Sequence, residues 1–231
     1  DRRTVSVAAG VLALGVFGAG RACAQAWPAA KPIRLVIGFA PGGAADYVAR
    51  ALDEPLGRAI GQAVVVENRA GAGSSLAADF VAKSPADGYT LLIASPSAIS
   101  VNPSLNPKLT YAKDLLPVTK LTSSPLVIAV HPDVPVRTLQ ELIALAKKKP
   151  GSLNYTSSGN GSAPHLGAAH FSAVTGVEMV HIPYKGGAPA ITDVLGGQLP
   201  LVAVNALEVV PHVKAGKMRV LAAMSANRSP I

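Results

Sequence analysis

The residues best suited to chemistry lie in glycine- and serine-rich segments, each of which follows an apolar run. These segments are FAPGGAAD (39–46), NRAGAGSS (68–75), SPSAIS (95–100), SSGNGSAPH (157–165), PYKGGAP (183–189) and NALE (205–208). Five of them lead into predicted helices, where free N–H groups and the positive end of the helix dipole converge. Glycine lets the main chain approach a ligand closely. Together the segments predict a cleft that binds small anions through main-chain groups.

Candidate ligand-binding residues come from the turns and polar positions of these segments. They are Phe39, Pro41, Gly42, Gly43, Ala44, Asp46, Gly73, Ser74, Ser95, Ser97, Ser158, Gly159, Gly161, Ser162, His165, Tyr184, Lys185 and Asn205. Gly43 is expected to reject a bulky side chain, because a Cβ would block the approach of an anion to the loop. Asp46 has two interpretations: it caps its own helix turn, or it contacts an amino group of a ligand.

Enzymatic motifs are incomplete. Gly71 and Gly73 have the spacing of a dinucleotide-binding loop, but Leu76 stands where that loop needs Gly or Ala. Ser74 and Ser75 resemble the nucleophile of a hydrolase elbow, yet no acid–histidine pair follows to activate them. The histidines do not have metal-ligand spacing. We expect no catalytic residue, no metal and no cofactor; the alternative is an exported serine hydrolase.

Composition and charge limit the class of protein. The chain has 231 residues, of which 49% are hydrophobic and 15% charged, too apolar a composition for a disordered protein. Its net charge is +8, but the basic residues are scattered, apart from a run at 147–149 that ends a predicted helix. Aromatic and basic residues do not alternate as in proteins that stack on bases. The basic field therefore favours small anions over nucleic acid.

The first 26 residues predict a secretory signal peptide. Arg2 and Arg3 precede an apolar run that is short and glycine-rich for a membrane span. Two sites of A-x-A form follow, at 22–24 and 24–26. Cleavage at either site would leave the mature chain without cysteine, because Cys23 is the only one. We therefore expect an exported, periplasmic protein without disulfides.

Strands and helices alternate along the rest of the chain. Predicted strands cover 33–38, 64–67, 88–95, 125–133, 153–159, 177–184, 198–205 and 218–225. Predicted helices cover 44–60, 75–82, 164–175 and 189–195, and a further helix begins after its cap, Thr138, with Glu141 completing a capping box. Such alternation predicts an α/β fold with a mainly parallel sheet covered by helices on both faces.

Four stretches resemble the Bug family, the periplasmic substrate-binding proteins of tripartite tricarboxylate transporters. They are KPIRLVIGFAPGGAADYVARAL (31–52), VVVENRAGAGSSLAADFVAKSPADGYTLL (64–92), GSAPHLGAAHF (161–171) and VHIPYKGGAPAITDVLGGQ (180–198). The likeness runs from about 31 to 230. Ala70 stands where the family commonly has Pro, and Ser74 where it commonly has Gly.

The resemblance implies a two-lobed, Venus-flytrap fold of the type II periplasmic binding proteins. It places lobe 1 at 27–125, lobe 2 at 126–218, and residues 219–231 back in lobe 1, and it implies that a C-terminal segment covering the first lobe is absent after Ile231. Lobe 2, being continuous, is then expected to be the more stable, and the fragment to be poorly soluble and to bind weakly.

The resemblance also implies the ligand and the partners. Similar proteins bind dicarboxylates, tricarboxylates, acidic amino acids or nicotinate, typically through the loops after the first strands of both lobes. The expected partners are a small organic carboxylate and the membrane subunits of a transporter, with no nucleic acid, for a monomeric receptor. A receptor that feeds a two-component sensor would use the same site and remains an alternative. Ser162 and His165 are expected to face the ligand only when the lobes close.

Overall fold

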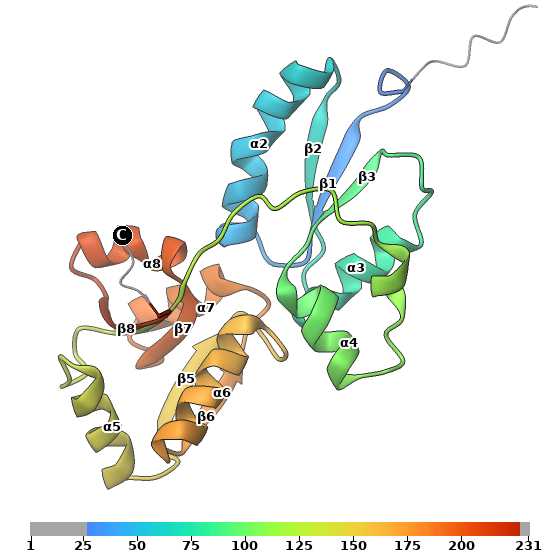
Figure 1. The fold of residues 1–231 in the computed structure, drawn as a ribbon. Coiled ribbons are helices and arrows are strands. Elements are labelled where there is room, and N and C mark those ends of the chain that lie inside the picture. The colour runs from blue at the N-terminus through green and yellow to red at the C-terminus, as the bar shows by residue number, and fades with distance from the viewer. Residues whose placement is uncertain (1–26, 227–231) are drawn as a thin grey trace, which may run out of the picture.

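The computed structural model describes residues 27–226, which form two α/β lobes (Figure 1). The strands of the first lobe end before residue 94, and those of the second begin at residue 126. Residues 115–125 connect the lobes without helix or strand. The predicted signal peptide (1–26) and the predicted turn at 227–230 lie outside the described residues.

The first lobe is built on a parallel sheet in the order β2 (Val64–Asn68), β1 (Ile33–Ile37), β3 (Thr90–Ile93). The central strand β1 is buried along most of its length, as expected for a strand covered on both faces. Helices α2 (Ala44–Ile60) and α3 (Ser75–Ala82) connect the strands, with the bounds that the sequence pattern predicts. Each helix begins seven residues after the last residue of the strand before it.

Short helical pieces that the sequence pattern did not predict complete the first lobe. They are a 3₁₀ turn at Ala72–Ser74, a π-helical turn at Ser97–Val101, α4 (Asn102–Leu105) and a 3₁₀ turn at Tyr111–Asp114. The buried side chain of Tyr111 joins its own 3₁₀ turn to α3 and to the π-helical turn. Its hydroxyl bonds to Ser75 Oγ and to the carbonyl oxygen of Ala98, each at 2.9 Å.

The second lobe has a five-stranded mixed sheet. Its order is β6 (Met179–Pro183), β5 (Leu153–Ser157), β7 (Leu201–Asn205), β4 (Leu126–Val130) and β8 (Arg219–Met224). Strands β6, β5 and β7 are parallel, whereas β4 runs antiparallel to both of its neighbours. The α/β architecture with mainly parallel pairing is confirmed.

Two hydrophobic cores cover the two faces of this sheet. Leu201 and Ala203 pack into the core beneath α5 (Leu139–Lys148) and α6 (Ala163–Thr175). Val202 and Val204 point the other way, because successive side chains of a strand alternate between faces. Their core is shared with α7 (Gly187–Leu195) and α8 (Ala206–Lys214). The predicted cap of α5 is present, since Thr138 Oγ1 accepts the N–H of Glu141 at 3.2 Å.

The last described strand corrects the expected path of the chain. Residues from 219 onward were predicted to return to the first lobe, but β8 pairs with β4 along its length in the second lobe's sheet. Leu126 faces Met224 and Val130 faces Arg219. The prediction is wrong for 219–224, because β4 leaves an open edge beside it that an apolar strand fills. Between residues 27 and 226, no helix is long and apolar enough to cross a membrane.

Candidate functional site

A cavity of about 190 Å³ lies between the two lobes, above the carboxyl ends of β1, β2, β5 and β6. Pockets for drug-sized molecules typically measure about 300–1,000 Å³, so this one suits a small ligand. Its lining comes mostly from main-chain turns, as predicted for this edge of the sheets. The lining residues are Gly38, Phe39, Gly71, Ala72, Gly73, Ser158, Gly159, Asn160, Pro183, Tyr184 and Lys185.

The first lobe contributes a strained turn to the cavity wall. Gly71, Ala72, Gly73 and Ser74 all have positive φ, and two of them are not glycine. Such left-handed conformations cost about 1–2 kcal/mol for residues with a side chain, and they cluster at functional sites. The turn carries its main-chain groups into the cavity, where a ligand can meet them.

Asn102, which the sequence analysis did not select, holds this turn in place. Its Nδ2 donates to the carbonyl oxygens of Gly73 at 2.9 Å and Ala72 at 3.3 Å, and to Ser75 Oγ at 2.9 Å. Its Oδ1 packs against Gly161 of the second lobe, where an added Cβ would lie 2.2 Å away. A single buried amide therefore fixes the strained turn and touches the opposite lobe.

Ser74 and Ser75, the two serines considered as nucleophiles, are both buried and have no activating partner within residues 27–226. Ser74 is fully buried against Gly38, and its Oγ has no hydrogen-bond partner among the described residues. Ser75 Oγ bonds to Asn102 and Tyr111. Both hydroxyls therefore lack the histidine contact that would activate them. In the described part of the chain, no three His, Cys, Asp or Glu side chains gather as a metal site.

The second lobe's wall is the turn between β5 and α6. Ser162 Oγ caps α6 by accepting the N–H of His165 at 3.3 Å, and His165 Nδ1 accepts the N–H of Gly161 at 3.3 Å. Ser158 and Gly159 line the cavity, whereas Gly161, Ser162 and His165 are not among its lining residues. The hydrogen bonds of the last three residues hold the turn in its conformation.

A stack of rings supports the same turn. His181 of β6 stacks on His165, with ring centroids 4.1 Å apart, and on Tyr155, at 4.9 Å. A hydrogen bond of 2.7 Å joins His181 Nε2 to Ser157 Oγ, which also accepts the N–H of Gly159 at 3.2 Å. Burial, with a smaller contribution from the charge of His165, lowers the pKa of His181 to about 4. Burial likewise lowers the pKa of His165, so both rings are neutral at neutral pH.

The carboxylate of Asp46 is fully occupied by hydrogen bonds within the first lobe. Its Oδ2 accepts the N–H of Gly42 at 3.0 Å and Arg50 Nε at 2.9 Å, and its Oδ1 accepts Asn68 Nδ2 at 3.0 Å. Burial opposes ionisation, but these bonds from Arg50, Gly42 and Asn68 outweigh it and hold the pKa of Asp46 below its usual value. This geometry favours the capping interpretation over contact with a ligand amino group.

The loop after β1 also meets the second lobe. Ala40 N–H donates to the carbonyl oxygen of Lys185 at 2.8 Å, and Ala44 N–H donates to Glu208 Oε1 at 3.1 Å. On the other side of the cavity, Ala163 N–H donates to Ser97 Oγ at 2.9 Å. The two lobes are therefore closed on each other around the cavity.

Several predicted residues lie outside the cavity lining. Pro41 and Gly42 are exposed, and Gly43 is buried, but a Cβ on Gly43 would meet no atom closer than 3.8 Å. Ser95 Oγ accepts the N–H of Ala98 at 3.4 Å and so caps the next turn. Asn205 Nδ2 donates to Glu208 Oε1 at 3.3 Å. The candidates that do line the cavity are Phe39, Gly73, Ser158, Gly159, Tyr184 and Lys185.

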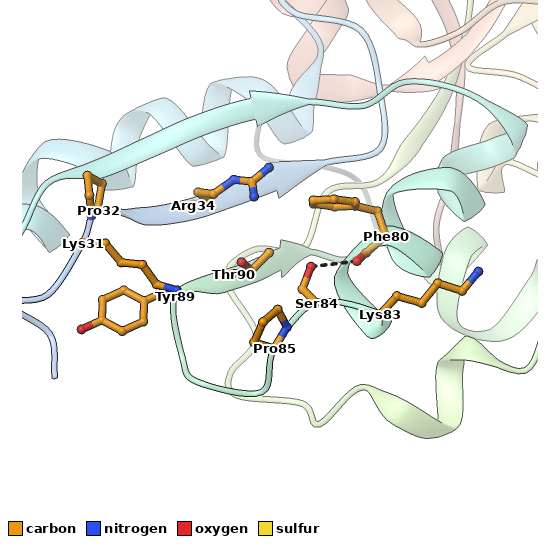
Figure 2. Close-up of a pocket in the computed structure, with 9 residues that line it drawn as sticks. All are labelled: Lys31, Pro32, Arg34, Phe80, Lys83, Ser84, Pro85, Tyr89 and Thr90. Atoms are coloured by element: carbon orange, nitrogen blue, oxygen red, sulfur yellow. Dashed lines mark hydrogen bonds between the residues drawn. The ribbon is translucent and has the colours of Figure 1, made fainter.

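A larger hollow of about 430 Å³ lies elsewhere on the first lobe (Figure 2). Its basic side chains are all paired: Lys31 with Asp87 at 2.8 Å, Arg34 with Glu67, and Lys83 with Asp79 at 2.7 Å. Arg34 and Phe80 point toward each other in Figure 2, with the guanidinium carbon 5.0 Å from the ring centroid. None of the glycine-rich turns reaches this hollow, so the interlobe cavity is the better candidate site.

Two α/β lobes closed around a small cavity with main-chain walls define a solute-binding protein. Comparison with known proteins agrees: the model of the tripartite tricarboxylate transporter family receptor matches residues 48–230, and the chain belongs to this family. Protein BugT of Bordetella pertussis is 42% identical over 209 residues, which cover 89% of this chain and 64% of BugT. The chain thus spans less than two thirds of that relative.

Solved structures of similar proteins have the same fold. Rpa4515 of R. palustris, determined with adipate, is 33% identical with a TM-score of 0.76, over 88% of this chain and 68% of that one. MatC of Rhodopseudomonas palustris, determined with bound malate, is 28% identical with a TM-score of 0.82, over 87% of this chain and 69% of that one. Periplasmic binding proteins are among the similar structures, which confirms the two-lobed fold.

Proposed function

We propose that this protein is a periplasmic receptor that captures a small organic carboxylate between its lobes and delivers it to a tripartite tricarboxylate transporter. The observation that carries the proposal is the interlobe cavity, whose walls are the turns at 38–39, 71–73, 158–160 and 183–185. Adipate and malate in two family structures support the ligand class. The family description supports the transporter.

The electrostatics of the cavity favour an anion. Helices α2, α3, α6 and α7 follow the strand ends that border the cavity, and the start of each helix carries a partial positive charge. Lys185 lines the cavity and forms no ion pair within residues 27–226. A carboxylate would satisfy both the main-chain donors and this cation.

Binding without turnover is the favoured activity. Ser74 and Ser75 are buried and lack a histidine partner, and Ser157 is fully buried although it bonds to His181. A nucleophile has to reach its substrate. The cavity therefore supports a receptor over the serine hydrolase considered above.

Calorimetric titration with mono-, di- and tricarboxylates tests the proposal, together with an esterase assay. We expect at least one acid to bind without turnover, and we expect Lys185→Gln to weaken that binding about tenfold, or ~1.4 kcal/mol. Lys217→Gln is the matched control, because Lys217 is an exposed lysine of the same lobe outside the cavity lining. Absence of binding by every acid, or ester hydrolysis by the protein, would contradict the proposal.

A further inference from the structure

Glu208 places a carboxyl group of the protein at the start of a helix that faces the cleft. Its side chain comes from α8 in the second lobe, and its Oε1 accepts the N–H of Ala44, the first residue of α2 in the first lobe, at 3.1 Å. Asn205 Nδ2 donates to the same oxygen at 3.3 Å. The main-chain donor at the start of α2 is therefore already occupied.

The second oxygen of Glu208 is buried and unpaired. Oε2 is shielded from solvent and has no hydrogen-bond partner among the described residues, although the side chain as a whole keeps a small exposed part. It lies against Gly187, the first residue of α7, where an added Cβ would be 1.5 Å away. Glycine at this position leaves just enough room for the carboxyl group. Burial raises the pKa of Glu208, whereas the bonds from Ala44 and Asn205 oppose that rise.

The position that Glu208 fills is one that would otherwise suit a ligand carboxylate. It lies between the starts of α2 and α7, and both helix dipoles favour negative charge there. The hydrogen bond between Ala40 and Lys185 joins the lobes next to this position. Lys185 and Phe39, which precedes Ala40, also line the cavity, so the cavity is adjacent. The cleft therefore has two anion positions, of which one is open and the other is occupied by the protein.

We propose that Glu208 determines specificity by occupying the second anion position, so that the receptor selects acids with one carboxylate over acids of the same length with two. This inference rests on the proposed function, because it assumes that the cavity binds a carboxylate. A diacid would have to leave its second carboxylate without the donors of α2, and beside the carboxyl group of Glu208.

Matched acids that differ only in the second carboxylate test the proposal. The pairs are hexanoate with adipate and butyrate with succinate, titrated calorimetrically into the purified protein. We expect the monoacid of each pair to bind at least about tenfold more tightly than the diacid. Tighter binding of both diacids would overturn the inference without any variant, while leaving the proposed carboxylate receptor intact. Failure of every acid to bind would instead contradict the proposed function.

Two substitutions separate occupancy from charge. Glu208→Ala vacates the position and also removes the contact with Ala44 between the lobes, which weakens every ligand alike. We therefore expect the ratio of diacid affinity to monoacid affinity to rise at least about tenfold. Glu208→Gln keeps the shape and the acceptor for Ala44 but removes the charge, so the preference for monoacids should persist. If diacid affinity rose equally in both variants, occupancy of the position would not be the cause of the preference. The proposal would also be overturned if Glu208→Ala brought no gain in diacid affinity relative to monoacid affinity.

Two controls keep the variants interpretable. Glu178→Ala removes one negative charge from an exposed residue of the same lobe and should leave both affinities unchanged. The thermal midpoint of each variant shows whether it folds. Should Glu208→Ala not fold, the wild-type preference and Glu208→Gln still decide the question, because each has an outcome that contradicts the proposal.

Discussion

The two lobes contribute to the site in different ways. Within residues 27–226, the second lobe has five strands with a large hydrophobic core on each face, whereas the first has three strands and two small cores. The first lobe fixes its cavity wall with buried polar groups, above all Asn102 and Tyr111. The second lobe therefore derives its rigidity from apolar packing, and the first lobe derives the rigidity of its cavity wall from a hydrogen-bond network.

Removing a core side chain from the second lobe gives the largest expected effect. Leu142 is fully buried, so Leu142→Ala should destabilise this lobe by about 3 kcal/mol through lost burial and the cavity left behind. Hydrogen exchange followed by mass spectrometry measures the loss separately for each lobe. Leu116→Ala is the control, because Leu116 is 89% exposed between the lobes and should change stability by less than about 0.5 kcal/mol. Equal losses in the two variants would contradict the packing argument.

Asn102→Ala should produce the next largest effect, confined to the first lobe. It removes the donor shared by Ala72, Gly73 and Ser75 and leaves the carbonyl oxygen of the buried Gly73 without this partner, at a cost of about 2 kcal/mol. Exchange in the peptides that contain residues 68–105 should accelerate, and ligand affinity should fall. Asn106→Ala, an exposed asparagine four residues along, is the matched control. Unchanged exchange in the strained turn would show that Asn102 does not hold it.

The histidine stack makes the second lobe sensitive to acid. The pKa of His181 is about 4 in the folded protein, below the ordinary value of 6.5, so folding disfavours its charged form. The neutral His181 leaves the free energy of unfolding undiminished above about pH 6.5, and this free energy decreases as the pH falls toward 4. Between pH 7 and pH 5, the titration of His181 should lower the free energy of unfolding by about 1–2 kcal/mol, which urea unfolding measures.

His181→Gln removes the titrating group but keeps a donor for Ser157, so its stability should depend less on pH over this range. His170→Gln, which changes an exposed histidine of α6, should retain the wild-type dependence. Identical slopes in wild type and His181→Gln would exclude His181 as the source of the pH dependence.

The smallest expected effect concerns closure of the lobes. Ser97→Ala removes the acceptor for Ala163 N–H, a contact made only when the lobes close. Affinity for the ligand should fall about fivefold, or ~1 kcal/mol, while the stability of each lobe stays within about 0.5 kcal/mol of wild type. Ser100→Ala, on the exposed side of the same turn, should leave affinity unchanged. A fivefold loss in both variants would contradict the assignment to closure.

Local patterns in the sequence were sufficient for most of the fold. Helices α2 and α3 begin and end where the apolar spacing and the flanking glycines predict, because such signals act within a few residues. The cap of α5 at Thr138 is equally local. The glycine-rich segments indicated the correct edge of the sheets, since carboxyl ends of parallel strands meet there.

Only the tertiary structure decided which residues face the cavity and which support it. In the sequence, Ser162 looks like a ligand contact and Asp46 allows either capping or a ligand contact. In the structure, the hydroxyl of Ser162 and the carboxylate of Asp46 both cap their own turns. The path of β8 depended on the open edge of β4, which lies 89 or more residues earlier in the chain. The periodicity of apolar residues in β8 does not reveal this pairing. The contacts of Asn102 with the strained turn and of Glu208 with Ala44 join residues about 30 and 164 positions apart. Such pairings follow from how the lobes pack and close, and no local pattern encodes them.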